Sequence, residues 1–270
     1  MSFVDPRKPG EALWPAKYPL SELRRRRVGM GEYDWASLYQ GRPAPSGGGL
    51  FREEWFAGKF VDAAPVLARR ARGWDTAATE GGGDYTCGVR IAEAGGIFYV
   101  EDVVRGQWSP ANAEARMKLT VELDGRGVAQ REEKEGGSAG KTVIEARTRT
   151  LAGADYEGVG ISGSKVTRSK PFRVQCEAGN VRIVRDRGRG GVDGVGWNKD
   201  YIDELCGFPT AKHDDQVDGS SCAFNAVLMM PPMVTAGPSS VDQSRSYWSG
   251  AGGAGAPQDE DEEVSSATVA

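Results

Sequence analysis

The stretch Ala71-Arg72-Gly73-Trp74-Asp75-Thr76-Ala77-Ala78-Thr79 predicts a β-strand that carries one acidic residue among apolar and small neighbours. A carboxylate inside such a strand costs free energy unless it is hydrogen-bonded, paired with a cation or bound to a metal ion. Taken alone, Asp75 is better interpreted as an aspartate that hydrogen bonds satisfy or that a sheet edge exposes. Other acidic residues along the chain therefore decide whether Asp75 belongs to a functional site.

The segments around this strand predict a mixed α/β fold. Residues 85–92 and 97–104 are expected to be strands around the Gly95-Gly96 turn, and these two strands form a meander with residues 71–79. A fourth short strand is expected before Gly136. Four segments have helical patterns, namely residues 109–123, 141–151, 197–206 and 214–230. The order of these elements favours a mixed sheet with helices on its faces.

A basic β-hairpin is expected as an insertion in this fold. Residues 172–176 and 181–184 alternate between apolar and polar side chains on either side of the turn at residues 177–180. The surrounding residues 160–190 hold eight Lys or Arg residues against only Glu177 and Asp186. Four of these cations are candidates for DNA-backbone contacts, namely Lys165, Arg168, Lys170 and Arg173. An ordinary solvated basic face is the alternative.

Composition divides the chain into three regions. Residues 1–62 are expected to be a lead-in and linker, residues 63–230 a folded domain, and residues 231–270 a disordered acidic tail rich in Pro, Gly and Ser. The tail holds six acidic residues against Arg245, so its net charge is −5, and the total of −4 leaves +1 for residues 1–230. The acidic whole-chain charge therefore does not argue against a nucleic-acid partner.

Membrane-spanning, secreted and zinc-binding proteins are disfavoured. No apolar run approaches the roughly 18–20 residues that cross a bilayer, and the first residues lack the pattern of a secretory signal. The four cysteines are widely scattered and His213 is the single histidine, so a zinc site is not expected. We expect a cytoplasmic protein with reduced cysteines.

A second group of acids opens the last predicted helix, in His213-Asp214-Asp215-Gln216-Val217-Asp218. Asp215 and Asp218 are three residues apart and share one helical face. The small residues Gly219, Ser220 and Ser221 would let this helix approach the sheet closely. Helix capping and interaction with the helix dipole explain one or two such acids equally well.

Glu135 is the third candidate. It precedes Gly136-Gly137-Ser138-Ala139-Gly140-Lys141-Thr142, which nearly matches a phosphate-binding loop. Glu135 stands where the first glycine of that loop belongs, and the preceding segment is polar, so nucleotide binding is rejected. Glu135 could instead end a strand as a metal ligand, or belong to a solvated run of charges.

Together these acids predict a site for divalent metal ions. Mg²⁺ and Mn²⁺ prefer oxygen ligands and need few carboxylates. Two such ions can activate water and stabilise the leaving oxygen of a phosphodiester. The candidate metal ligands are Asp75, Glu135, Asp214, Asp215 and Asp218.

The motifs and their order resemble the large terminase subunits of tailed phages. The segment joining the two domains of that family resembles residues 35–43 and 49–56 of this chain. The nuclease domain resembles the motifs at residues 74–77, 84–86, 105–110, 135–141, 165–171 and 213–218. The family carries an N-terminal ATPase motor, whereas this sequence has no matching loop, so we expect a fragment, a split gene or a prophage remnant.

The resemblance implies an RNase H-like nuclease that cuts double-stranded DNA during viral packaging in the cytoplasm of a bacterial host. Asp75 takes the place of the first-strand acid, Glu135 that of the central acid, and Asp215 and Asp218 those of the helix acids, which makes these four the candidate catalytic residues. Duplex DNA, a terminase small subunit, a portal protein and a separate ATPase chain are the expected partners. The alternatives are a non-catalytic module that binds DNA or the portal, and a nuclease like the Holliday-junction resolvases.

Overall fold

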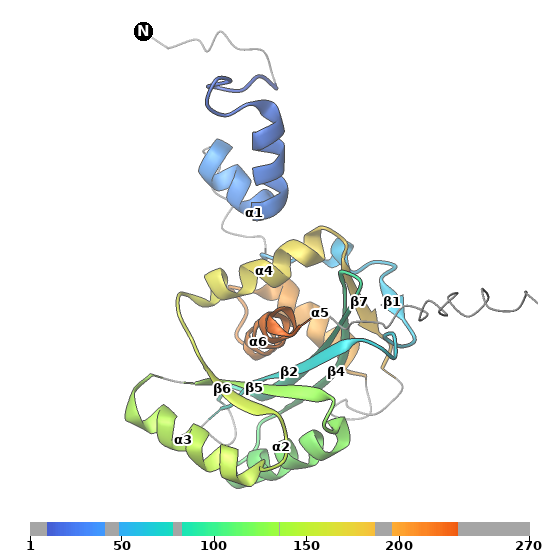
Figure 1. Ribbon diagram of the computed structural model, residues 1–270, viewed down its shortest axis with the longest axis vertical. Coiled ribbons are helices and arrows are strands. Elements are labelled where there is room, and N and C mark those ends of the chain that lie inside the picture. Colours follow the sequence, from blue (N-terminus) through green and yellow to red (C-terminus); the bar gives the residue numbers. More distant parts are fainter. Residues whose placement is uncertain (1–9, 41–48, 78–82, 135, 187–195, 232–270) are drawn as a thin grey trace, which may run out of the picture. The chain divides into compact units, whose positions relative to one another are not determined.

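The computed structural model describes residues 10–40, 49–77, 83–134, 136–186 and 196–231. These residues form a seven-stranded sheet with helices on both faces (Figure 1). The strands are β1 (Phe60–Val61), β2 (Arg69–Asp75), β3 (Thr86–Ala94), β4 (Ile97–Gly106), β5 (Val128–Lys134), β6 (Tyr156–Gly160) and β7 (Val181–Val184). The helices are α1 (Leu20–Gln40), α2 (Pro110–Asp124), α3 (Gly137–Thr150), α4 (Lys165–Glu177), α5 (Trp197–Gly207) and α6 (Asp215–Met229), and a short 3₁₀ helix spans Glu53–Trp55.

The sheet is mixed, with strand order β1-β7-β4-β3-β2-β5-β6. β2, β3 and β4 form the expected antiparallel meander. β5 runs parallel to β2, and β6 runs parallel to β5. Because β2 and β5 are parallel, their carboxyl ends lie at the same edge of the sheet.

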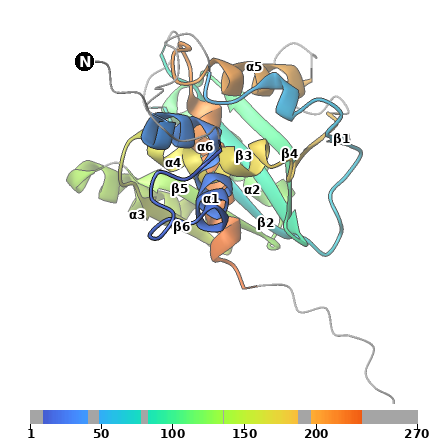
Figure 2. The same ribbon diagram turned by 90° about the horizontal axis from the view of Figure 1, so that it is seen from above.

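Two helical layers cover the sheet. α4, α5 and α6 lie on one face, whereas α2 and α3 lie on the other (Figure 1). Figure 2 shows the first of these layers from above, with α6 in the middle. The larger core lies under this layer and includes Phe172, Phe224 and Tyr201. A smaller core on the opposite face joins Trp74 of β2 to Met117 of α2.

α6 lies directly against β2 because glycine removes the side chain between them. A Cβ atom on Gly73 would lie only 2.3 Å from the backbone oxygen of Gly219 and 2.4 Å from the backbone nitrogen of Ala223. Ser220 and Ser221, which follow Gly219, are buried. This is the close approach that the small residues predict, and it brings the first turn of α6 to the carboxyl end of β2.

The opposite face of β2 holds a buried network of charges. Arg72 is 1% exposed, and its guanidinium donates to Asp124 at 2.7 Å and to Asp102 at 2.7 Å. Arg90 also contacts Asp124, at 2.7 Å. Buried cations are tolerated when they are paired and hydrogen-bonded in this way.

Most of the predicted elements are confirmed, including the helix that begins at Pro110. The side chain of Ser109 accepts a hydrogen bond from the backbone N–H of Asn112 and so caps α2. The predicted mixed α/β fold with helices on the sheet faces is likewise confirmed. None of the described helices is both long and apolar enough to cross a bilayer.

The predicted β-hairpin is wrong, because residues 172–176 belong to helix α4. The buried residues of α4 are Ser169, Phe172, Arg173 and Cys176, and their spacing of one, three and four follows the helical period. Ser164 caps this helix by accepting from the backbone N–H of Thr167 at 3.2 Å. Only residues 181–184 form a strand, and β7 pairs in parallel with β1 and β4.

The folded part also begins earlier than residue 63. Leu50, Phe51 and Phe56 are buried in the larger core, and β1 pairs with β7 at the sheet edge. β6 is a further strand that the sequence pattern did not predict. Residues 1–9 and 41–48 of the predicted lead-in and linker lie outside the described residues, as does the predicted acidic tail after residue 231.

Candidate active site

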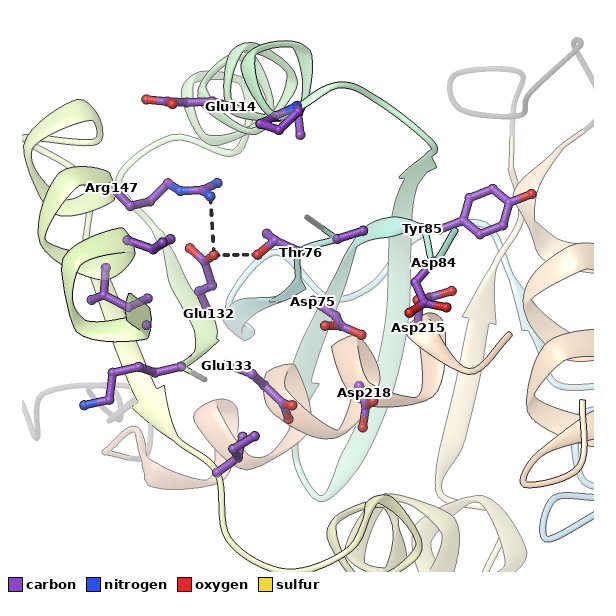
Figure 3. A pocket seen from close by; sticks show the side chains of 18 of the residues that line it. Asp75, Thr76, Asp84, Tyr85, Glu114, Glu132, Glu133, Arg147, Asp215 and Asp218 are labelled. Carbon is purple, nitrogen blue, oxygen red and sulfur yellow. Dashed lines mark hydrogen bonds and ion pairs between the residues drawn. The ribbon is translucent and has the colours of Figure 1, made fainter. Parts of the chain in front are cut away.

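Seven acidic residues in the described part of the chain line one cavity of about 940 Å³, and four of them come from three elements that meet at one end of the sheet strands. Asp75 ends β2, Glu133 lies near the end of β5, and Asp215 and Asp218 lie in the first turn of α6. Figure 3 shows the side chains of Asp75, Glu133 and Asp218 grouped in one part of this cavity. Further along, the cavity is lined by apolar residues of α2 and α3.

The strand register explains why Asp75 and Glu133 meet. Trp74 of β2 pairs with Glu132 of β5 in the parallel ladder, so the next residue of each strand points to the other face of the sheet. That face is covered by α6, whose approach over Gly73 brings Asp218 close to Asp75. Sheet register and helix packing thus gather acids that are far apart in the sequence.

Burial and mutual repulsion hold these carboxyl groups in an unfavourable environment. Burial, followed by the charges of Asp218, Asp215 and Glu133, raises the pKa of Asp75 to about 8. Burial and then the charge of Asp218 raise the pKa of Glu133 to about 7. Raised carboxyl pKa values of this size are typical of functional sites, and buried ion-pair networks produce them as well.

Two cations from the first turn of α4 partly neutralise the acids. Lys165 Nζ lies 2.6 Å from Asp214 Oδ1 and 2.8 Å from Asp218 Oδ2. Arg168 Nη2 donates to Asp218 Oδ1 at 2.7 Å and to Glu133 Oε2 at 3.0 Å. Burial opposes the charge of Lys165, but its hydrogen bonds to Asp214 and Asp218 outweigh burial and raise its pKa.

Asp215 has an oxygen without a hydrogen-bond partner among the described residues. Its Oδ2 atom is buried, and His213 Nδ1, which is cationic only when the ring is protonated, lies 3.9 Å away. Burial, and then the charge of Glu204, raises the pKa of Asp215 to about 6. Glu204 in turn accepts from the backbone N–H and from Nε2 of Gln216, each at 2.7 Å, which fixes the start of α6.

Glu132 lines the same cavity but belongs to a separate network. Its carboxylate accepts from Thr76 Oγ1 at 2.9 Å and from Tyr156 Oη at 2.6 Å, and Arg147 lies 3.5 Å away. Figure 3 shows Glu132 turned toward Arg147 and Thr76. We therefore assign Glu132 a structural role in joining β5, β6 and α3.

The donor set is chemically suited to a divalent metal ion. All four groups are carboxylates, the ligands that Mg²⁺ and Mn²⁺ prefer, and the free Oδ2 atom of Asp215 adds an unsatisfied acceptor. Yet no three His, Cys, Asp or Glu side chains within the described residues are arranged to hold an ion as they stand. The ion pairs of Asp218 and Glu133 with α4 use the same oxygens that a metal would need.

Most of the predicted site residues that the structure describes lie at this cavity. Asp75, Asp215 and Asp218 line it together with Lys165 and Arg168, and Asp214 contacts Lys165 beside it. Lys170 and Arg173 instead face Asp34 of α1, at 2.7 Å and 3.5 Å, and Arg173 is 2% exposed. Glu135 lies outside the described residues, so its predicted role as a ligand stays a prediction.

Glu133 is the site residue that sequence reasoning missed. Glu133 directly follows Glu132, which pairs with Trp74, so Glu133 lies on the same face of the sheet as Asp75. This position is the signal that could have identified Glu133. That signal required the register of β5 against β2, which the polar sequence of the predicted strand before Gly136 does not define.

Comparisons with known proteins agree with this fold. A family model described as the terminase RNaseH-like domain matches residues 72–227. This span covers more than half of the chain and includes Asp75, Glu133, Asp215 and Asp218. The chain therefore belongs to the family of terminase RNase H-like domains. No protein of curated function matches the sequence.

A solved large terminase shares the fold, and solved terminase nuclease domains are also similar to this chain. The large terminase of a thermophilic bacteriophage, solved in complex with ADP, is 11% identical, with a TM-score of 0.54 over 78% of this chain and 52% of that chain. The large terminase nuclease of thermophilic phage G20c, solved with magnesium, is 18% identical over 67% of this chain and 98% of that chain, with a TM-score of 0.47. The P22 large terminase nuclease domain is 12% identical over 66% and 91%, with a TM-score of 0.46. Other structures of the G20c nuclease hold zinc or cobalt.

Proposed function

We propose that this chain is a divalent-metal-dependent endonuclease that hydrolyses phosphodiester bonds of double-stranded DNA during viral genome packaging. The observation that carries the proposal is the group of acids at the shared edge of β2 and β5, where Asp75, Glu133, Asp215 and Asp218 line one cavity. Membership of the terminase RNase H-like family supports the same function.

Asp75, Asp215 and Asp218 would hold the metal ions, and Glu133 supplies a further carboxylate beside them. Bound Mg²⁺ or Mn²⁺ ions, two in the mechanism that we favour, supply an activated water and stabilise the leaving oxygen of the phosphodiester. The acids must be ionised to take part. Because their pKa values are raised, hydrogen ions compete with the metal below about pH 8.

The cations of α4 would bind the DNA backbone. Lys165 is 45% exposed and lies beside the acids, so its ammonium can contact a phosphate entering the cavity. Phosphate contacts of this kind position a duplex without reading its bases. Lys170 lies further along the same helix. Its side chain is partly exposed and pairs with Asp34 of α1.

The test is cleavage of purified DNA in the presence of Mn²⁺ or Mg²⁺. We expect linear and supercoiled duplexes to be cut with either ion and to stay intact with EDTA. Salt-sensitive binding of DNA without cleavage in any divalent metal would instead indicate a non-catalytic packaging module. Cleavage confined to four-way junctions, with linear duplexes untouched, would indicate an enzyme like the junction resolvases. The packaging partners predicted from the sequence, namely a small subunit, a portal protein and an ATPase chain, stay predictions.

A further inference from the structure

Both carboxylate oxygens of Asp218 are occupied by cations of one helix. Oδ2 lies 2.8 Å from Lys165 Nζ, and Oδ1 accepts from Arg168 Nη2 at 2.7 Å. The same guanidinium nitrogen donates to Glu133 at 3.0 Å. Asp218 is buried, so water cannot replace these contacts easily. A metal ion that binds Asp218 in this arrangement must share these oxygens with the two cations, so withdrawal of a cation would favour its binding.

Two of the other acids, Asp75 and Asp215, have no Lys or Arg in ion-pair contact within the described residues, and Asp75 feels the charge of Lys165 only from a distance. Asp75 forms no ion pair within the described residues, and its carboxyl group is surrounded by Asp218, Asp215 and Glu133. A free Oδ2 atom on Asp215 adds to the negative potential. The two cations therefore contact Asp218 and Glu133 directly and leave Asp75 and Asp215 without a Lys or Arg partner among the described residues.

The cations are also placed so that they can withdraw. Lys165 is the first residue of α4, its side chain is 45% exposed, and its flexible stem allows the ammonium to turn toward solvent. Arg168 is held by its two carboxylate contacts and by a hydrogen bond of 3.3 Å from Nη1 to the Gly163 carbonyl, whereas its buried Nε has no hydrogen-bond partner among the described residues and can gain one on moving. Both side chains line the cavity that would admit a DNA phosphate.

We infer that Lys165 and Arg168 are exchangeable counter-ions, which occupy Asp218 and Glu133 in the metal-free protein and transfer to DNA phosphates when a duplex binds. This inference rests on the proposed nuclease function and adds a way in which DNA regulates metal binding at the same site. Without DNA, the two cations compete with the metal ion and weaken its binding. With DNA, the phosphates draw them away, the acids are released and the metal binds more tightly. Metal and DNA therefore bind with positive coupling, which must be reciprocal.

Permanent structural ion pairs are the competing explanation. They would stabilise α4 against α6 and would remain in place when metal or DNA binds. Removing them would lower stability without strengthening metal binding. The affinity for the metal ion, measured without catalysis, separates the two explanations.

The experiment measures Mn²⁺ binding by isothermal titration calorimetry, with and without a saturating short phosphorothioate duplex, which keeps its charge and resists cleavage. The proteins are the parent, the double variant Lys165→Met/Arg168→Met, and Lys199→Met as the control. Lys199 is an exposed lysine of α5 that pairs with Asp203 and lies outside the cavity.

Without DNA, we expect the double variant to bind Mn²⁺ at least about 5-fold more tightly than the parent, the lower end of typical coupling. With the duplex, the parent should gain at least about 5-fold, and the double variant should gain much less. Lys199→Met should behave as the parent does. Equal or weaker Mn²⁺ binding by the double variant, or a parent affinity that the duplex leaves unchanged, would overturn the inference.

Two further measurements keep the outcome decisive. If the double variant does not fold, the conservative variant Lys165→Arg/Arg168→Lys replaces it. Exchange requires that the duplex strengthen Mn²⁺ binding in the parent and in this conservative variant. If the parent binds Mn²⁺ no better than Asp75→Asn and cleaves no DNA, the proposed function itself fails. Metal-dependent cleavage together with a duplex-independent Mn²⁺ affinity refutes the exchange alone.

Discussion

The guanidinium of Arg168 lies 2.7 Å from the carboxylate of Asp218. A cation of α4 therefore neutralises part of the acidic group that α6 and the sheet bring together. Asp75, on β2, has no comparable cation among the described residues, and burial and repulsion raise its pKa to about 8. The stability of the metal-free protein should therefore depend on pH through Asp75.

The free energy of unfolding should fall as the pH rises from about 4 to about 8 in EDTA. The ordinary pKa of Asp75 is 3.8 and its folded value is about 8, so the folded state binds the proton more tightly. The stabilising contribution is complete below the unfolded pKa and is lost as the pH rises through the folded one. Asp75→Asn should flatten this decline and be more stable than the parent at pH 8 in urea unfolding. If the free energies of unfolding of the parent and Asp75→Asn change in parallel with pH, the charge of Asp75 does not destabilise the folded protein.

Glu133→Gln should lower the rate of Mn²⁺-dependent DNA cleavage by at least about 10-fold, the lower end of what losing a group beside a metal ligand costs. Its carboxylate lies on the same face of the sheet as Asp75 and contacts the Arg168 guanidinium at 3.0 Å. Glu157→Gln, on an exposed position of β6 outside the cavity, is the matched control and should retain the parent rate. If Glu133→Gln is fully active and Glu135→Gln is not, the central acid is Glu135.

Gly73→Ala should lower the free energy of unfolding by about 1–3 kcal/mol, the range for adding a methyl group to a packed core. The new Cβ would meet the backbone of Gly219 and Ala223, at 2.3 and 2.4 Å, and would push α6 away from β2. Mn²⁺ affinity measured by calorimetry should fall as well, since Asp215 and Asp218 move with α6. Gly127→Ala, with open space around its Cβ position, is the control. Unchanged stability and metal affinity in Gly73→Ala would refute the role of this contact.

Arg72→Met should destabilise the protein by about 3–5 kcal/mol, because it leaves buried carboxylates without their partner. Arg72 holds Asp124 and Asp102 on the face of β2 opposite the acids, so the Mn²⁺ affinity of the folded variant should match that of the parent. Arg52→Met removes an exposed pair with Glu54 and should cost no more than about 1 kcal/mol. Thermal unfolding measures both effects. A large loss of Mn²⁺ affinity in Arg72→Met would show that the two faces of the sheet are coupled.

The elements with strong local signals could be predicted from the sequence. The meander of residues 71–104 has a glycine turn, and α2 begins with Ser109 and Pro110. Helix α4 was missed because the apolar residues of 172–176 alternate over too short a stretch to distinguish a strand from a helix, and its buried cation Arg173 obscures the helical pattern. Strands β1 and β6 depend on pairing with distant strands rather than on local pattern.

The candidate site was predictable only in part for the same reason. Asp75, Asp215 and Asp218 stand out as acids among apolar or small residues, and the structure brings all three to one cavity. Glu133 and Glu135 have the same parity along the chain, so alternation could not choose between them. The ion pairs of Lys165 and Arg168 with the acids follow from the position of α4 against α6, which no local motif encodes.

The most direct test of the nuclease site is the initial rate of plasmid cleavage in Mn²⁺ by the parent, Asp75→Asn and the control Asp203→Asn. Asp203 is an exposed acid of α5 outside the cavity. We predict that Asp75→Asn loses more than about 100-fold in rate, since even the partners of metal ligands are worth about 10- to 100-fold, while Asp203→Asn cleaves as the parent does. An Asp75→Asn variant that cuts plasmid DNA as fast as the parent would contradict the assignment of this cavity as the active site.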